Sequence, residues 1–434
     1  MEQGPAVPAY VLRGHEAPVH ALHFYADNAF LASGDSDGWV VLWSLSSKRP
    51  VAVWKAHEAG ILQIQHWTHD RLISHGRDHK LRVWQVRPEL LASLSRKLPV
   101  EAEAPTVTAS GSAAGLPPTQ PWLLHALSVS ALNFCAFAMC DEHAAGETAA
   151  AAAAAAAVAG EAPSQLIASP NGLDSGGIDI FQLPSEKRVS QIGSDKDDPT
   201  GMVMAVSLWH KEDGLVLAAG YEDGRVMVYA HVHVHQGDQS DLNGSGFTWK
   251  KVLMSKPHIQ PVLSVKFLPC KSKSQFLTSS ADARIGKFSL PTILAQTAVN
   301  EMQPERAINT KHAGQQGLSV RSDGKIFATA GWDGRVRIYS YRTMKQLAVL
   351  KWHKAGVYST AFADISSENE NEVDAYNGSE EQEHTSSPAA GTPGVSRPMN
   401  ALDLIKQKRE DKARRIHWLA AGGKDGKISL WDIY

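Results

Sequence analysis

Apolar and polar residues alternate over short runs through most of this chain, and turn-forming residues separate the runs. The first unit reads RGHEAPVHALHFYADNAFLASGDSDGWVVLWSL, and the next reads KAHEAGILQIQHWTHDRLISHGRDHKLRVWQV. A period of two is typical of β-strands. The Asp-Gly pair at 37–38 suits a tight hairpin, because glycine tolerates a positive φ. The pattern therefore predicts a series of short antiparallel strands joined by tight turns.

Four residue types recur in these units. In the first two units a serine is followed by an aspartate four positions later and by a tryptophan ten positions later, with a histidine upstream. The frame returns in four further units, and a degenerate seventh between residues 122 and 184 has Ser175 where the aspartate is expected. The predicted sets are His15, Ser33, Asp37 and Trp43; His57, Ser74, Asp78 and Trp84; His258, Thr278, Asp282 and Phe288; His312, Thr329, Asp333 and Tyr339; and His353, Asp425 and Trp431.

These residues resemble the WD repeats of the Gβ type. His15 and His57 are 42 positions apart, within the spacing of about 40–45 residues that is typical of WD40 blades. One four-stranded sheet cannot bury its faces alone, whereas seven sheets stacked around an axis can. We therefore predict an all-β fold, a seven-bladed WD40 β-propeller that forms a single domain over residues 1–434. Residues 9–13 should supply the outer strand of the last blade, because the chain ends on a third strand.

Three insertions interrupt the repeats, at residues 88–120, 141–163 and 364–414. Their Ala/Pro/Ser-rich or acidic compositions bury too little apolar surface to offset ordering entropy, so we expect disorder. Helical spacing predicts one short helix near 401–415. Its basic cluster has two interpretations. It serves nuclear import or contact with a partner, or it is simply a solvated helix face. The cluster is Lys406, Lys408, Arg409, Lys412, Arg414 and Arg415.

Composition argues against several function classes. Lys and Arg number 43 and Asp and Glu 45, so the net charge of −2 predicts no direct binding to nucleic acid or a membrane. The three cysteines have no zinc-like spacing, and the chain shows no signal peptide, which favours a soluble intracellular protein. His231, His233 and His235 share one face of a strand and favour either a metal site or a polar edge. We expect no cofactor and no metal.

The histidine, serine and aspartate of each set are also the residue types of a hydrolase triad. The sets recur in several units, however, and a nucleophile has no reason to be replicated. In WD40 families these residues form a hydrogen-bonded chain within each blade, which satisfies buried polar groups. The sequence therefore predicts that the protein is not an enzyme.

A ring of residues is the predicted partner-binding face. In a propeller the turns between second and third strands open on one face, so the residue before each turn aspartate should contribute to one ring. Two tryptophans, an arginine and both charge signs are typical of an interface hot spot. The alternative is that the two tryptophans only pack on adjacent turns. The predicted face is Ser36, Arg77, Glu222, Ala281, Trp332 and Lys424, with Trp352 on a neighbouring loop.

Particular segments resemble one family more closely, the fungal ASTRA-associated WD-repeat proteins. They include PAYVLRGHEAPVHALHFY, HGRDHKLRVWQVRP, PWLLHALSVSALNFCAF and TAGWDGRVRIYSY. The resemblance implies a nuclear, non-catalytic scaffold of the ASTRA complex. That complex is linked to chromatin remodelling and to maturation of phosphatidylinositol-3-kinase-related kinases. Its implied partners are HEAT-repeat chaperone subunits, RuvB-like AAA+ ATPases and a large kinase-related protein. The alternatives are a substrate receptor of a ubiquitin ligase and a Gβ-like signalling subunit.

The predicted disorder can be tested by limited proteolysis. Early cuts should fall within 100–118, 141–163 and 366–398 while the fragments stay associated, because exposed polar loops are cleaved before packed strands. Mass spectrometry of the first fragments locates the cuts. Slow degradation without early cuts in these windows would contradict the prediction.

Overall fold

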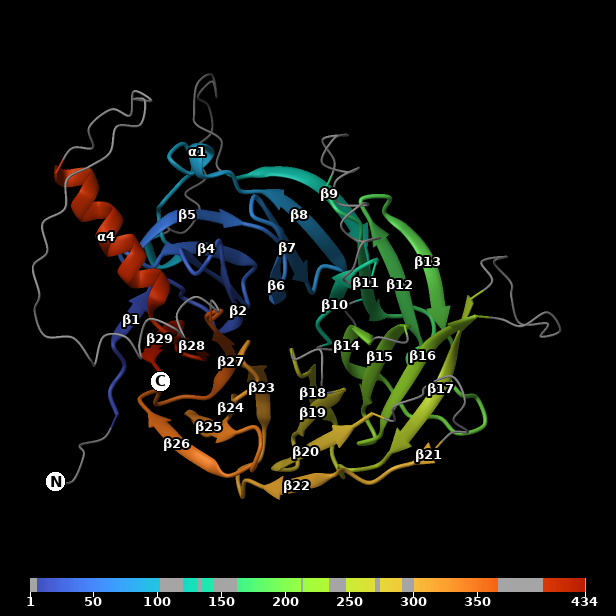
Figure 1. The fold of residues 1–434 in the computed structure, drawn as a ribbon. Helices are drawn as coiled ribbons and strands as arrows, with labels where there is room; N and C mark the ends of the chain where they lie inside the picture. The colour runs from blue at the N-terminus through green and yellow to red at the C-terminus, as the bar shows by residue number, and fades with distance from the viewer. Residues whose placement is uncertain are drawn as a thin grey trace, which may run out of the picture.

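The strands of this protein form seven sheets around a central axis, as Figure 1 shows. The structure is a computed structural model. It describes residues 6–101, 120–130, 135–143, 162–211, 214–233, 247–269, 274–290, 300–365 and 401–433. The sheets follow one another along the chain, so the fold is the predicted seven-bladed β-propeller.

Each blade runs from an inner strand at the axis to an outer strand at the rim (Figure 1). Blade 1 holds β2 (Val19–Tyr25), β3 (Phe30–Asp35), β4 (Trp39–Ser44) and β5 (Arg49–Lys55). Blade 2 holds β6 (Ile61–Thr68), β7 (Arg71–Gly76), β8 (Lys80–Gln85) and β9 (Trp122–Ser128). Blade 3 holds β10 (Ala138–Asp141), β11 (Gln165–Pro170), β12 (Ile178–Leu183) and β13 (Lys187–Ile192). Blade 4 holds β14 (Val203–Lys211), β15 (Gly214–Tyr221), β16 (Val226–His233) and β17 (Phe247–Ser255), and the short parallel strand β21 (Asn300–Glu301).

The remaining blades complete the ring. Blade 5 holds β18 (Val262–Phe267), β19 (Gln275–Ser280), β20 (Arg284–Ser289) and β22 (Arg306–Asn309). Blade 6 holds β23 (Gln315–Val320), β24 (Ile326–Gly331), β25 (Arg335–Ser340) and β26 (Gln346–Lys351). Blade 7 holds β27 (Val357–Phe362), β28 (Trp418–Gly423), β29 (Lys427–Asp432) and β1 (Tyr10–Arg13). Within the described residues the helices are α1 (Pro88–Leu91), a 3-10 turn at Pro99–Glu101 and α4 (Ala401–Arg415).

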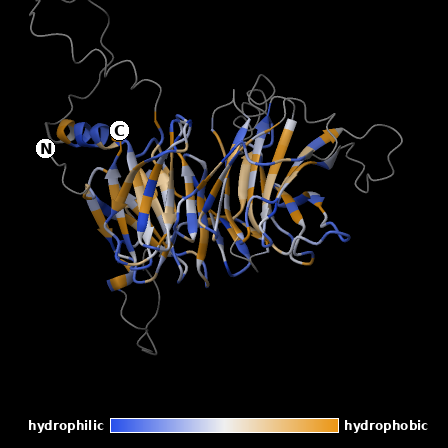
Figure 2. Ribbon diagram, turned by 90° about the horizontal axis from the view of Figure 1, so that it is seen from below, coloured by the Kyte–Doolittle hydropathy of each residue, from blue (hydrophilic) through white to orange (hydrophobic). Residues whose placement is uncertain are grey.

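The core consists of apolar layers between neighbouring blades. One cluster joins Leu22 and Val41 of blade 1 to Ala420 and Leu430 of blade 7, and another joins blades 1 and 2. Figure 2 shows these hydrophobic segments along the strands, with hydrophilic residues in many of the loops at both ends. Each blade therefore depends on both neighbours for the burial of its faces.

The two ends of the described chain close the ring, as predicted. Strand β1 pairs antiparallel with β29, with Tyr10 opposite Leu430 and Arg13 opposite Lys427. Leu12 is 1% exposed and belongs to the apolar layer between blades 7 and 1. The pairing covers the edge that β29 would otherwise present.

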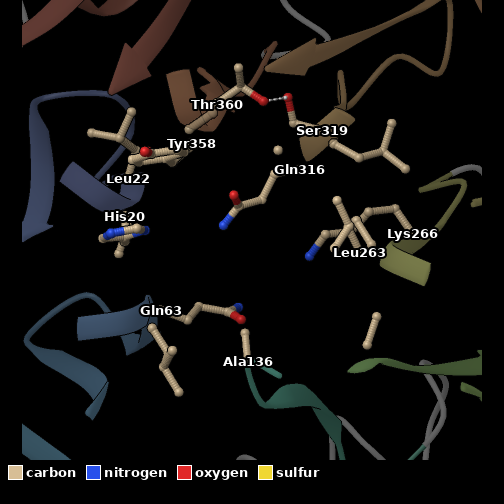
Figure 3. A pocket seen from close by; sticks show the side chains of 18 of the residues that line it. His20, Leu22, Gln63, Ala136, Leu263, Lys266, Gln316, Ser319, Tyr358 and Thr360 are labelled. Carbon is tan, nitrogen blue, oxygen red and sulfur yellow. Dashed lines mark hydrogen bonds between the residues drawn. The ribbon is translucent and has the colours of Figure 1, made fainter. Parts of the chain in front are cut away.

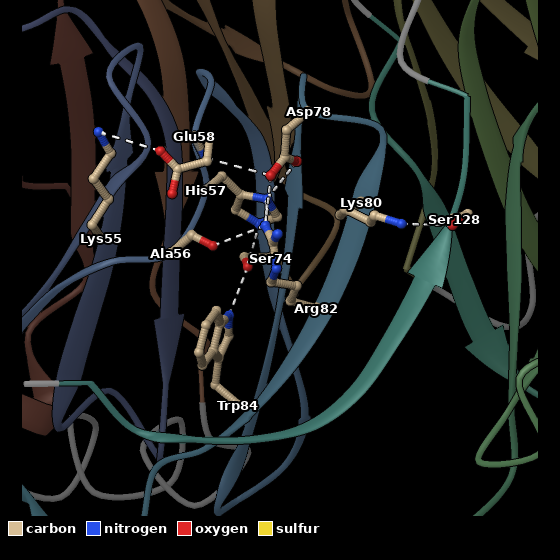
Figure 4. A network of polar contacts seen from close by, with 10 residues as sticks. All are labelled: Lys55, Ala56, His57, Glu58, Ser74, Asp78, Lys80, Arg82, Trp84 and Ser128. Atoms are coloured by element: carbon tan, nitrogen blue, oxygen red, sulfur yellow. Dashed lines mark hydrogen bonds and ion pairs between the residues drawn. The ribbon is translucent and has the colours of Figure 1, made fainter. Parts of the chain in front are cut away.

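The predicted hydrogen-bonded chain is complete in blade 2, as Figure 4 shows. Nδ1 of His57 lies 2.8 Å from the Asp78 carboxylate, and its Nε2 lies 2.7 Å from Oγ of Ser74. The indole N–H of Trp84 donates to the same Ser74 hydroxyl at 2.8 Å. In blade 5 His258 likewise joins Thr278, at 2.9 Å, to Asp282, at 3.2 Å. Phe288 has no N–H to donate and stacks on Phe276 at 4.9 Å instead.

Blade 1 corrects one predicted member of these sets. The carboxylate that contacts His15 belongs to Asp35, at 2.6 Å, and not to Asp37. Asp35 lies two residues after Ser33 on the same face of β3, so its side chain points toward the histidine. Asp37 is exposed in the turn beyond the strand. Ser33 and Trp43 occupy their predicted places, with His15 Nε2 2.7 Å and Trp43 Nε1 2.8 Å from the Ser33 hydroxyl.

Blades 6 and 7 replace one member each. In blade 6 the Thr329 hydroxyl donates to the side chain of Gln315 at 2.7 Å, so Gln315 takes the place predicted for His312. His312 is partly exposed and lies 3.5 Å from Asp333, whose carboxylate pairs with Arg337. Tyr339 is buried and stacks on Phe327 at 4.9 Å.

In blade 7 the hydroxyl that was missing from the predicted set comes from Ser429. His353 Nε2 and Trp431 Nε1 both lie 2.9 Å from its Oγ, and His353 Nδ1 lies 3.5 Å from Asp425. Ser429 stands opposite Ala421 in the β28–β29 ladder. The hydroxyl therefore lies on the third strand of blade 7, whereas the second strand carries it in blades 1, 2, 5 and 6.

The first predicted insertion begins later than expected. Residues 88–101 form α1 and the 3-10 turn, and Leu91 and Leu94 are buried in the layer between blades 1 and 2. The apolar side chains of these two leucines explain this packing. The average composition of 88–120 does not reveal them, because most of the segment is rich in Ala, Pro, Ser and Thr. The predicted helix is present as α4, anchored where the Trp418 indole donates to the Ala413 carbonyl at 2.9 Å. Residues 102–119, 144–161 and 366–400 lie outside the described part of the chain.

Deletion of the first strand should destabilise the propeller. Removing Met1 to Leu12 exposes the edge of β29 and the apolar layer beneath Leu12, which should cost about 3 kcal/mol or more. Thermal unfolding of the truncated chain measures this loss, with deletion of residues 1–5 as the control. A melting temperature within about two degrees of that of the full-length chain would contradict this role of β1.

A buried histidine should make the propeller sensitive to acid. His75 is 0% exposed, and burial lowers the pKa of its imidazole to about 3. In the unfolded chain the pKa of histidine is about 6.5, so the unfolded state binds more protons below that pH. The contribution of His75 to the free energy of unfolding is complete above pH 6.5. It should fall by about 1.4 kcal/mol per pH unit as the pH drops from there toward 3.

Urea unfolding at pH 7 and pH 5 tests this expectation. His75→Gln should reduce the loss of stability between the two values, whereas the same change at the exposed His69 should leave the loss unchanged. Equal pH dependence in His75→Gln and in the unmutated chain would show that His75 is not responsible.

Candidate partner-binding face

Six of the predicted face residues occupy equivalent positions in their blades. In each, the backbone N–H donates to the carbonyl of the residue that precedes the inner strand of the same blade. The pairs are Ser36 and Pro18 at 2.9 Å, Arg77 and Gly60 at 2.8 Å, Glu222 and Met202 at 2.9 Å, Ala281 and Pro261 at 3.2 Å, Trp332 and Gly314 at 3.1 Å, and Lys424 and Gly356 at 2.8 Å. The shared hydrogen bond places these residues at one end of the ring, around the axis. We call this end the turn face.

The inner strands carry a second ring of residues, which the repeat pattern does not reveal. In six of them the pairing register shifts at the second residue, so that one extra residue bulges from the ladder. The bulged residues are His20, Leu62, Met204, Leu263, Gln316 and Tyr358. They line a central cavity of about 370 Å³, part of which Figure 3 shows from close by.

Trp332 is held in place on the turn face although its side chain is 48% exposed. Its indole N–H donates to the side-chain oxygen of Gln316 at 2.9 Å. Its ring lies against Gly314, where an added β-carbon would come within 2.1 Å of the indole. Gly314 also has a φ of +71°, a conformation that favours glycine. The tryptophan is therefore fixed in one orientation while it remains accessible to a partner.

Trp352 contributes less to the turn face than Trp332 does. It is partly buried against the apolar layer between blades 6 and 7, and its ring meets His353 edge-on at 4.8 Å. Glu222, Trp332 and Lys424 are exposed, whereas Ala281 is partly buried. The two tryptophans thus have different environments.

A pocket of about 410 Å³ opens between blades 1 and 2 on the turn face. It is lined by the predicted residues Ser36 and Arg77 together with His20 and Leu62. The ring of His20 stacks on Tyr358 of blade 7, with centroids 4.9 Å apart and planes 1° from parallel. Burial, and then the charge of Arg77, lower the pKa of His20, so its imidazole is neutral at pH 7. The pocket therefore combines an arginine with neutral aromatic and aliphatic groups.

The hydroxyl and thiol groups that could act as nucleophiles are largely inside the blades. Ser33 and Thr278 are fully buried, and Ser74 is 1% exposed, so a substrate has no access to these hydroxyls. Cys135 is buried and Cys140 is partly buried, and burial raises the pKa of both thiols. Cys270 lies outside the described residues.

The histidine run at 231–235 is only partly described. His231 packs against the ring of Trp249, with centroids 4.9 Å apart. The side chains of His233 and His235 lie outside the described part. Within the described part, no group of three or more His, Cys, Asp or Glu residues is placed to hold a metal ion. Among the same residues, no helix is long and apolar enough to cross a membrane.

Comparison with known proteins places this architecture in a family. The family model for ASTRA-associated protein 1 matches residues 8–431. A protein of Penicillium rubens with the name ASTRA-associated protein 1 is 46% identical over 446 residues, covering 100% of this chain and 98% of the relative. Proteins of the same name are 44% identical in Aspergillus niger, covering 100% of this chain and 98% of the relative, and 32% identical in Schizosaccharomyces pombe, covering 82% and 93%. The chain therefore belongs to the ASTRA-associated protein 1 family.

Proposed function

We propose that this protein is a non-catalytic scaffold, a nuclear subunit of an ASTRA-type complex that binds partner proteins through its turn face. Membership of the ASTRA-associated protein 1 family, over residues 8–431, carries the first part of the proposal. The preorganised Trp332 of blade 6 and the pocket between blades 1 and 2 support the second part. The role in chromatin remodelling and in maturation of phosphatidylinositol-3-kinase-related kinases belongs to the same proposal.

The turn face has the chemistry of a protein-binding hot spot. Hot spots are enriched in tryptophan, tyrosine and arginine, and they contribute most when the free protein already holds them in place. Tyr358 lines the central cavity, Arg77 lines the pocket between blades 1 and 2, and Trp332 bonds to Gln316 of the cavity wall. Hydrogen bonding orders the ring of Trp332, and stacking on His20 orders that of Tyr358. Because these rings are already ordered, they lose little side-chain entropy when a partner covers them, so a small interface can reach a useful affinity.

The proposed partners are protein subunits of the complex. They are HEAT-repeat chaperone subunits, RuvB-like AAA+ ATPases and a large kinase-related protein. We propose no direct contact with nucleic acid. Identification of the proteins that co-purify with the tagged chain also separates this function from a ubiquitin-ligase receptor or a Gβ-like subunit, because those classes bring different partners.

Substitution of two hot-spot residues should weaken the complex without unfolding the propeller. Trp332→Ala combined with Arg77→Ala should reduce partner binding by about 2 kcal/mol or more, since both side chains project from the turn face. Co-purification with quantitative mass spectrometry measures retention of the complex, and thermal unfolding should change little.

A matched pair on the outer surface serves as the control. Leu347→Ala with Lys345→Ala removes one large exposed apolar group and one cation from blade 6, away from the turn face. This pair should leave retention unchanged. Full retention in the Trp332 and Arg77 variant, at normal protein levels, would place the binding site elsewhere on the molecule.

A further inference from the structure

Blade 3 carries a longer turn than its neighbours, and this turn presents a leucine to solvent. Residues 171–177 join β11 to β12, whereas residues 36–38 join the same two strands of blade 1. The turn therefore belongs to the turn face, at the position for which the repeat pattern provided no residue in this blade. Leu173 is 103% exposed, more than any other large hydrophobic residue in the described ranges.

Buried polar side chains at the base hold this turn in one conformation. The Asn171 amide nitrogen donates to both carboxylate oxygens of Asp179, at 2.9 and 3.0 Å. Its oxygen accepts from the backbone N–H groups of Leu173, at 2.7 Å, and Asp174, at 2.8 Å. Asn171 and Asp179 are 6% and 7% exposed. One buried amide thus fixes the backbone that carries the exposed leucine.

Further hydrogen bonds fix the turn to blade 4. The Asp174 carboxylate accepts from the backbone N–H of Ser194 at 2.8 Å, and the Ser175 carbonyl accepts from Val203 at 2.9 Å. Partial burial alone would raise the pKa of Asp174, but the hydrogen bonds from Ser194, Gly176 and Gly177 outweigh it and lower the pKa. The carboxylate is therefore ionised at neutral pH.

A single exposed leucine is ordinary on a protein surface and by itself indicates nothing. Leu173 differs because hydrogen bonds hold its backbone in place, its side chain contributes nothing to the core, and its turn joins the same two strands as the turns that carry the predicted face residues. A fixed apolar tip loses little conformational entropy when a partner covers it. These properties suit an anchor that inserts into a pocket.

The surroundings of the tip are acidic, which indicates the charge of the partner. Six carboxylates lie on the turn and on the adjoining loops of blade 4, and three cations accompany them. Two of the cations are already engaged, because Arg225 pairs with Asp223 and Asp198, and Lys251 pairs with Asp195 at 3.1 Å. The carboxylates belong to Asp174, Asp195, Asp197, Asp198, Glu222 and Asp223, and the third cation is Lys196. The excess negative charge should attract a basic surface and repel an acidic one.

We propose that the Leu173 turn is a second docking point on the turn face, which inserts into an apolar pocket rimmed by lysine or arginine residues on a protein partner. The proposal rests on the proposed function for the class of partner, which is a protein. The position of the docking point does not depend on the site at Trp332 and Arg77. The Leu173 turn lies on blade 3, whereas Arg77 lies on blade 2 and Trp332 on blade 6, so a partner that reaches both Leu173 and Trp332 would span the mouth of the central cavity.

Three variants of the full-length tagged chain test this proposal in a fungal host that lacks its own copy. Leu173→Ala should lower the amount of co-purifying ASTRA subunits about fivefold, and Leu173→Glu about twentyfold. Leu347→Glu is the matched control, because Leu347 is 59% exposed on the outer strand of blade 6. The control should stay within about twofold of the unmutated chain, and the melting temperatures of all three should agree, since neither leucine is buried.

The acidic surroundings are tested separately. Asp197→Lys should lower retention of the same subunits, and retention by the unmutated chain should fall as salt screens the charges. A photo-crosslinking residue at position 173 should join a partner peptide that contains lysine or arginine and apolar residues. The same residue at position 347 should not, and Asp197→Lys should weaken the crosslink at 173.

The outcomes separate this proposal from the proposed function. If both Leu173 variants retain the subunits within twofold, the docking point is wrong, whatever the Trp332 and Arg77 variant does. If the unmutated chain brings down no ASTRA subunit, the proposed function is wrong, and the crosslink at 173 then decides alone. A crosslink to a basic apolar peptide that Asp197→Lys weakens would support the docking point, and no specific crosslink would overturn it.

Discussion

The ring depends on one contact that is repeated at four of the seven junctions between blades. A glycine with positive φ, in the turn between second and third strands, lies against the backbone of the loop that leads to the next blade. A β-carbon on Gly38 would lie 2.0 Å from the carbonyl oxygen of His57, and one on Gly426 would lie 2.3 Å from that of His15. The Gly38 carbonyl in turn accepts from the backbone N–H of His57 at 3.1 Å. The backbone of each histidine thus contacts the preceding blade, and its side chain forms hydrogen bonds within its own blade.

Much of this frame could be predicted from the sequence because it depends on spacing. The number of blades and the helix at 401–415 follow from periodicity and turn residues, and the structure contains them. The closing strand, predicted at 9–13, runs over 10–13 in the structure. The aspartate of blade 1 was misassigned for a local reason. In blade 2 the residue two positions after the serine is Gly76, where an added β-carbon would come within 2.8 Å of the Asp78 carboxylate. In blade 1 that position holds Asp35, which supplies the carboxylate itself and leaves Asp37 outside. An aspartate instead of glycine at this position was the available signal.

Other features could not be read from spacing because they depend on pairing across the sheet. Ser429 replaces a hydroxyl only because it stands opposite Ala421 in the ladder. The bulged residues such as His20 and Tyr358 line the central cavity because the register shifts at the second residue of the inner strand. A strict alternation of two would have assigned them to a different face. The candidate site was therefore predictable at its rim, through Ser36, Arg77 and Trp332, and not at its centre.

Blade 3 shows how the frame and the surface can change independently. The described part of this blade has no histidine-centred chain, yet its four strands pair in the same order as those of its neighbours. Asn171 and Asp179 perform the fastening instead, through hydrogen bonds within one hairpin. This arrangement does not require a three-residue turn with a glycine against the next blade, so the turn can be longer. The side chain of Leu173 at its tip contributes nothing to the core, so the residue there can change without a change in the frame.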